Sequence, residues 1–294
     1  MIMTMLQEPQ EPVNIGEMIF HHTGDAHNLD FSPFGEIELP QWQPVHIGGM
    51  EIDLSPTRHV VFMLLAATIV FVALMLAARG VARARRENRA PRGFANAVDG
   101  LVLWVRNDIA IANIGHEMGP KYAPLIMTFF FFILVCNLLG LLPFGASPTG
   151  NLAVTGALAL IAFIAIEVGG MIKLGFKGYL GTIWMHVDGL PPVGSFLISL
   201  FMVPIELLSK MVKPFALTVR LFGNITAGHF VILAMFGIVF TFGNVHNPGS
   251  WALGFATAAF VTGVMILELL VAALQAYVFA TLAAVFIGLM QHEH

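Results

Sequence analysis

Residues 59–80 read HVVFMLLAATIVFVALMLAARG, an apolar run followed at once by a cluster of arginines. About 20 such residues cross the hydrocarbon core of a bilayer as a helix. The cluster consists of Arg79, Arg83, Arg85, Arg86, Arg89 and Arg92. Because basic residues gather at the cytoplasmic end of a membrane helix, we expect the N-terminus to lie outside the cytoplasm and the loop after residue 80 to lie inside it.

The rest of the chain is similarly apolar. Of its 294 residues, 57% are hydrophobic and 11% are charged, whereas soluble domains carry roughly a quarter of charged residues. We therefore predict an all-α integral membrane protein whose membrane domain covers residues 58–290 and has about five membrane helices. These helices are expected over residues 59–80, 122–142, 152–173, 193–240 and 251–290.

Two further features of the membrane domain follow from its pattern. Residues 94–115 combine helical apolar spacing with interrupting charges, which predicts an amphipathic helix in the membrane interface. The segments 193–240 and 251–290 are too long for a perpendicular span, so they must tilt strongly, kink, or both. Pro204 and Pro214 are the expected kink points in the first of them. Together the two segments predict a long tilted hairpin.

Residues 1–57, the leader, contain nine of the 18 acidic residues and no Lys or Arg. They lack the basic start and compact apolar core of a secretory signal peptide. We interpret the leader as an acidic extracytoplasmic tail. Lys173 and Lys177, which follow the third expected span, agree with the arginine cluster about the cytoplasmic side. Residues 291–294 are then a cytoplasmic C-terminus.

Several kinds of site are not expected. The chain has no phosphate-binding glycine motif, so we predict that it is not itself an enzyme and holds no cofactor. Cys136 is the single cysteine, which excludes an intramolecular disulfide. Three histidines of the leader, His21, His22 and His27, lie close together in FHHTGDAH. Histidines in a polar tail are more often solvated than bound to metal, so no metal site is predicted.

Arg220 is the residue that an apolar helix least tolerates. It lies in PFALTVRLFGNITAGHF, far from both ends of its segment, and no Lys or Arg follows it. An arginine in hydrocarbon costs at least about 2.5 to 3.5 kcal/mol on insertion scales. A buried ion pair and snorkelling to the interface are the structural alternatives. Only Glu268 and Glu293 follow as acids, and the position is central, so we interpret Arg220 as functional.

Polar residues of the hairpin line up near this arginine. Glu268 and Gln275 are seven residues apart and share a helical face. Asn224 is one turn beyond Arg220 on the same face. His229 lies roughly half a turn round from that face, so it needs tilt or twist to join the same path.

The direction of the two segments adds a second argument. At 1.5 Å per residue, His229 stands about 13 Å outward of Arg220. Glu268 stands about 10 Å outward of Gln275. If Gln275 is level with Arg220, the imidazole and the carboxylate meet at one depth on the external side. Both groups can exchange protons near neutral pH, as a proton path requires. A structural His/Glu pair is the alternative.

Two weaker candidates complete the set. Glu206 lies four turns inward of Arg220, nearly on its face, and could line a path that opens to the cytoplasm. An ion pair with Lys210 at spacing i,i+4 explains it equally well. Asn137 could line the external path, and helix packing is again an equal alternative.

The stretch ELLSKMVKPFALTVRLFGNITAGH resembles the signature of subunit a of F-type ATP synthases, with RLFGN at residues 220–224. The later LQAYVFATLAAVFI is similar to the final helix of that family, whose glutamine matches Gln275. PTGNLAVTGALAL, from Pro148, resembles a third stretch. The resemblance covers residues 122–290, and the leader has no counterpart in it.

The resemblance implies a stator subunit that conducts protons through two offset half-channels to and from the carboxylates of a rotating c-subunit ring. Arg220 would separate the half-channels, because a guanidinium keeps its proton where a lysine could lose it. His229 and Glu268 match a polar pair whose members exchange places within the family. The implied partners are the c-ring, the b-subunit peripheral stalk, the remaining ATP synthase subunits and membrane lipid, with no nucleic acid, in a cell (inner) membrane.

Two other functions are compatible with the same residues. A proton-coupled secondary transporter could bind an anionic substrate at Arg220, although such proteins usually contain internal repeats and this sequence shows none. A purely structural membrane anchor would leave the intramembrane Arg, Glu and His unexplained.

Overall fold

The computed structural model describes residues 24–30, 35–47, 50–53, 55–142, 145–184, 192–242 and 248–292. In this part of the chain, five helices are long and apolar enough to cross a membrane. They are α2 (Arg58–Arg86), α5 (Gly119–Gly140), α6 (Leu152–Ile183), α7 (Pro192–Phe242) and α8 (Pro248–His292). The predicted all-α fold with about five membrane helices is confirmed.

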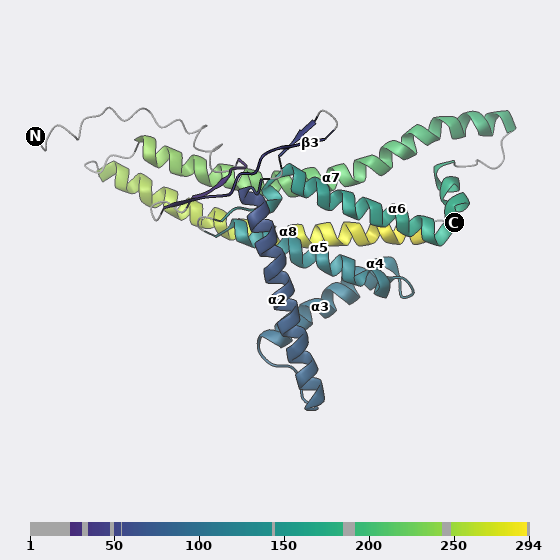
Figure 1. Ribbon diagram of the computed structural model, residues 1–294, viewed down its shortest axis with the longest axis horizontal. Coiled ribbons are helices and arrows are strands. Elements are labelled where there is room, and N and C mark those ends of the chain that lie inside the picture. The colour runs from purple at the N-terminus through teal and green to yellow at the C-terminus, as the bar shows by residue number, and fades with distance from the viewer. Residues whose placement is uncertain are drawn as a thin grey trace, which may run out of the picture.

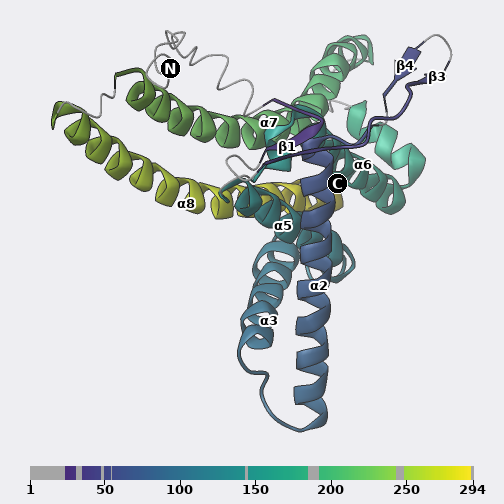
Figure 2. The ribbon, with the colours of Figure 1, turned by 60° about the vertical axis from the view of Figure 1, so that its left-hand side comes forward.

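α2 crosses the other long helices rather than running alongside them (Figure 1). It exposes Leu64 and Phe71 by 60% and 63%, as expected of a helix that faces lipid. α3 (Phe94–Trp104) returns beside the last turns of α2, and Figure 2 shows the two side by side. Gly80 permits this close approach, because a Cβ there would lie 2.6 Å from the Cβ of Ala95.

The amphipathic segment 94–115 forms consecutive helical pieces. α3 continues into a π-helical stretch, η1 (Val105–Ile111), and then into α4 (Ala112–Ile114). None of these pieces is among the membrane spans in the described residues. η1 buries Ile109 and other apolar side chains, whereas its polar residues 106–108 are exposed. One face therefore packs on the bundle and the other carries the charges.

α6 contains a break that the sequence did not predict. Residues 152–173 were expected as a helix, and α6 instead extends to Ile183, with its span ending at Gly175. Gly175 has φ 68° and ψ 164°, a backbone conformation that only glycine adopts readily. The last eight residues of α6 consequently point in a new direction.

α7 and α8 form the expected hairpin. Both helices are continuous over far more than one span, and α7 passes through Pro204 and Pro214 without ending. Figures 1 and 2 show both as gently curved helices that run across α2. If α2 follows the membrane normal, the hairpin is strongly inclined to it, as its length requires.

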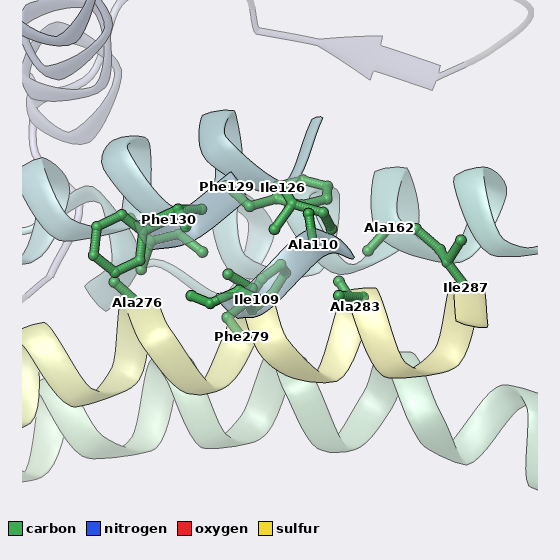
Figure 3. Packing of buried hydrophobic residues seen from close by; sticks show 14 of the residues in the cluster. Ile109, Ala110, Ile126, Phe129, Phe130, Ala162, Ala276, Phe279, Ala283 and Ile287 are labelled. Atoms are coloured by element: carbon green, nitrogen blue, oxygen red, sulfur yellow. The ribbon is translucent and has the colours of Figure 1, made fainter. Parts of the chain in front are cut away.

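The core lies between α8 and the helices around it. Small side chains line the packed face of α8, including Ala276, Ala280 and Ala283, each fully buried. They allow η1, α5 and α6 to approach closely (Figure 3). Larger rings fill the remaining space, as where Phe129 meets Phe279 edge to face at 5.3 Å. α8 is thus the central element of the bundle.

The leader contains two antiparallel hairpins of three-residue strands, which the sequence did not predict. β1 (Asn28–Asp30) pairs with β2 (Glu36–Glu38), and β3 (Val45–Ile47) pairs with β4 (Met50–Ile52). Arg58, at the start of α2, donates to the carbonyl of Gly24 at 2.6 Å. Between α5 and α6, the turn η2 (Pro148–Gly150) precedes Asn151, whose side chain caps α6 and bonds Asp25 of the leader at 3.1 Å. The described leader therefore rests on the N-terminal ends of α2 and α6.

Gly288→Ala is expected to destabilise the bundle. A Cβ at Gly288 would overlap the carbonyl group of Asn113 in α4, with the carbonyl carbon only 3.0 Å away. Backbone cannot move aside as a flexible side chain can, so overpacking should cost about 1 to 3 kcal/mol. Thermal unfolding of the purified complex measures this. Gly254→Ala is the matched control on the same helix, because its Cβ meets no atom within 4 Å. An unchanged unfolding temperature for Gly288→Ala would contradict the prediction.

Candidate functional site

Arg220 projects from α7 on the side away from the core. Leu217 and Leu221 flank it and are 4% and 0% exposed, so they fix which face of α7 packs inward. Arg220 itself is exposed, beside the exposed apolar side chains of Phe215 and Val219. Among the described residues, none forms an ion pair with it. The guanidinium is therefore a full positive charge on an apolar surface without a partner in this part of its own chain.

Asn224 and Gln275 fix the register of the hairpin next to that charge. The Asn224 Nδ2 donates to Gln275 Oε1 at 3.0 Å. Gln275 is only 3% exposed, and a buried carboxamide needs such a partner. The sequence argument took Gln275 level with Arg220 as a condition, and the structure pairs Gln275 with Asn224, one turn further along α7.

Glu268 lies against the backbone of α7 at Gly228, the residue before His229. It is 9% exposed, and its Oε2 has no hydrogen-bond partner in the described part of the chain. A Cβ at Gly228 would overlap the Glu268 carboxylate. Glu268 therefore lies at the level of residue 228 of α7, next in the sequence to the half-buried His229, and among the described residues the two side chains share no hydrogen bond or ion pair. The sequence analysis did not identify Gly228 as the residue that Glu268 packs against. The only sign of it in the sequence is a small residue beside the polar His229 in an apolar helix.

Asn137 is held in a polar network inside the bundle. Its Nδ2 donates to the carbonyl of Ala272 on α8 at 3.2 Å, and its Oδ1 accepts from Thr149 at 2.6 Å. Thr149 in turn shares a hydrogen bond of 2.7 Å with Ser147. Asn137 is 1% exposed, so these bonds satisfy a fully buried amide. They tie α5 and η2 to α8, which supports the helix-packing interpretation of this residue.

Glu206 does not form the ion pair with Lys210 that its spacing allows. Lys210 pairs instead with Glu167 on α6, with 3.5 Å between Nζ and Oε2. Glu206 is half-buried and takes part in no ion pair among the described residues. The sequence did not single out Glu167, because an acid in an apolar run gives no sign of which helix faces it.

The histidines of the leader that the structure describes, His27 and His46, belong to no cluster of metal-ligand side chains. His21 and His22 lie outside the described residues, and His27 makes a bond of 3.4 Å between its Nδ1 and the carbonyl oxygen of Pro56. In the part of the chain that the structure describes, no three His, Cys, Asp or Glu side chains gather as metal ligands. The site consists of the polar side chains of the hairpin alone.

Asn137→Leu tests the packing interpretation. It removes the partner of Thr149 inside the bundle and should cost about 1 to 3 kcal/mol of stability. Thr128→Val on the same helix is the control, because Thr128 is exposed and bonds only the carbonyl of Pro124 in its own helix. Thermal unfolding of the complex should separate the two variants. Normal stability of Asn137→Leu together with lost proton conduction would instead place Asn137 in the path.

Comparison with known proteins identifies the family. The family model described as "ATP synthase A chain" matches residues 60–288. ATP synthase subunit a of Chloroherpeton thalassium is 41% identical over 275 residues, which cover 93% of this chain and 76% of that protein. ATP synthase subunit a 2 of Chlorobaculum tepidum is 42% identical, covering 93% and 72%, and subunit a of Anaeromyxobacter dehalogenans is 41% identical, covering 94% and 70%. The chain belongs to the ATP synthase subunit a family.

Proposed function

We propose that this chain is the stator subunit that conducts protons in a rotary F-type ATP synthase, and that Arg220 separates its two half-channels. The observation that carries the proposal is an exposed guanidinium on a membrane helix with no carboxylate near it in the described residues. An ionised carboxylate of a neighbouring c-subunit would supply the missing counter-charge. Because guanidinium does not release its proton, it attracts that carboxylate without passing a proton across.

The remaining polar residues suit the two half-channels. His229 and Glu268 would carry protons on the external side, next to the Asn224–Gln275 bond that joins α7 to α8. The Oε2 of Glu268 is buried and has no hydrogen-bond partner among the described residues, so it is available as a proton acceptor. Glu206 would serve the cytoplasmic side, since no lysine among the described residues pairs with it. One proton that crosses a potential of 100 mV supplies about 2.3 kcal/mol. The energy of several proton transfers must therefore be added together by rotation to make one ATP.

The surroundings of the chain follow from this function. We propose the c-ring, the b-subunit peripheral stalk and the other synthase subunits as partners, and a non-catalytic role in which ATP chemistry takes place elsewhere. The subunit would lie in the inner membrane of the cell. Residues 58–290 would cross that membrane, residues 1–57 would lie outside the cytoplasm, and residues 291–294 would lie in the cytoplasm. The two basic clusters, after residues 78 and 172, support this orientation.

Arg220→Ala should abolish ATP synthesis driven by a proton gradient while the complex still assembles, since no fixed charge then separates the half-channels. Purified complex in vesicles, energised by an acid–base jump, provides the measurement. Arg220→Lys should also lose most activity, because a lysine in low dielectric can lose its proton. Arg92→Ala, an exposed arginine of the cytoplasmic cluster, is the control and should match the parent. Full synthesis by Arg220→Ala would refute the proposal.

Exchange of His229 and Glu268 tests the external pair. His229→Gln and Glu268→Gln should each lower synthesis by about a hundredfold, the usual contribution of one proton-transferring group. The double variant His229→Glu, Glu268→His restores one imidazole and one carboxylate at the same level and should exceed both single variants. A double variant no better than either single one would indicate that the two groups do not share a path.

A further inference from the structure

Lys210 has two carboxylates within reach and pairs with only one. Glu206 lies four residues earlier on α7, at the spacing that ordinarily forms a helical ion pair. The ammonium instead lies 3.5 Å from Glu167 Oε2 on α6. Lys210 is 6% exposed, so its position is determined by protein contacts rather than by water.

Three groups of α6 hold the lysine. Besides Glu167, the hydroxyl of Tyr179 lies 3.3 Å from Lys210 Nζ. The ring of the same tyrosine lies under the ammonium, with 4.4 Å from Nζ to its centroid, a favourable cation–π distance. Tyr179 also donates its hydroxyl hydrogen to the Glu167 carboxylate, which fixes the acid toward the lysine. Glu167, Tyr179 and Lys210 therefore form one closed cluster, which we call the lysine clamp.

The break in α6 makes the lysine clamp possible. Residues 167 and 179 are twelve apart, so a straight helix would separate them by about 18 Å. Gly175 lies between them with φ 68° and turns the end of α6 back, so that Tyr179 reaches Glu167. Any other residue at position 175 would strain this conformation. The glycine and the clamp thus belong to a single arrangement.

The clamp leaves Glu206 without a counter-charge. The other nearby lysine of α7, Lys213, lies over the ring of Phe286 on α8, 5.2 Å from its centroid. Arg220 is fourteen residues further along, about 21 Å away along the helix. None of the three cations of this part of α7 therefore neutralises Glu206, although two of them are within two turns.

We propose that Glu167 and Tyr179 sequester Lys210 so that the Glu206 carboxylate stays free to take up and release protons. Glu167 and Tyr179 are then positioning residues for the cytoplasmic half-channel, and the inference rests on the role proposed for Glu206. An ammonium beside a carboxylate favours its ionised form, so a released Lys210 would hold Glu206 charged and slow its exchange.

Glu167→Gln provides the test, in the complete ATP synthase reconstituted into vesicles. The variant frees Lys210 to pair with Glu206 at i,i+4, and synthesis driven by an acid–base jump should fall about tenfold. Adding Lys210→Met removes the competing cation, and the double variant should return to within about twofold of the parent. Lys210→Met alone should also keep parental activity, because Glu206 stays unpaired. A purely structural clamp would give the same rescue, because Lys210→Met removes the buried charge that Glu167→Gln leaves unpaired. Thermal unfolding of the complex separates the two: sequestration of Lys210 predicts that Glu167→Gln loses synthesis at the parental unfolding temperature, whereas a purely structural clamp would lower both.

Other results would overturn the inference. Parental activity in Glu167→Gln would overturn it. A double variant as impaired as Glu167→Gln alone would also overturn it, because Glu167 would then carry protons or hold the fold itself. The content of this subunit in the purified complex reports assembly. If Glu167→Gln does not assemble, Glu167→Asp replaces it, because its shorter side chain withdraws the carboxylate and should show the same loss and the same rescue.

Glu206→Gln separates this inference from the proposed function. It should lose most proton-driven synthesis. If it retains parental activity, the role of Glu206 and the inference both fail, while the Arg220 variants still decide whether the chain conducts protons as a stator subunit.

Discussion

Arg220 carries a permanent positive charge on a membrane helix, and no acid among the described residues of its own chain pairs with it, so its position depends on how α7 is held. Leu217 and Leu221 pack inward and leave Arg220 on the outer side of α7. The Asn224–Gln275 bond fixes α7 against α8 one turn away. α8 in turn is held by the small residues that let η1, α5 and α6 approach it. The position of one guanidinium thus depends on packing across the whole bundle.

The inclination of the hairpin changes how distance along α7 relates to depth in the membrane. Counting residues places His229 about 13 Å beyond Arg220, and a perpendicular helix would turn all of this into depth. If α2 follows the membrane normal, much of that distance lies parallel to the membrane plane instead, because α7 and α8 run across α2 (Figure 1). A tilted hairpin can therefore present a long face at nearly constant depth.

Sequence reasoning predicted the parts of the structure that follow from hydropathy and helical spacing. Apolar runs of sufficient length identify the spans, and the seven-residue spacing of Glu268 and Gln275 identifies their common face. The register between α7 and α8 could not be predicted, because it depends on which amides meet across the hairpin. The lysine clamp was missed for a related reason. Its members come from two helices and need the reversal at Gly175, which has no signal beyond a glycine in an apolar helix.

The charged residues of the membrane helices fall into two groups that differ in their contacts. Glu167 and Lys210 are buried together and satisfy each other, so their charges stabilise the contact between α6 and α7. Arg220, Glu206 and the Oε2 of Glu268 have no such partner in the described residues. Leaving a charge unpaired in a membrane is unfavourable, and a fold that can build a closed pair at Lys210 has the means to pair the others. That Lys210 pairs with Glu167 of α6 and leaves Glu206, four residues away on its own helix, without an ion pair among the described residues supports the proposal that Glu206 and Glu268 exchange protons, while Arg220 keeps its own.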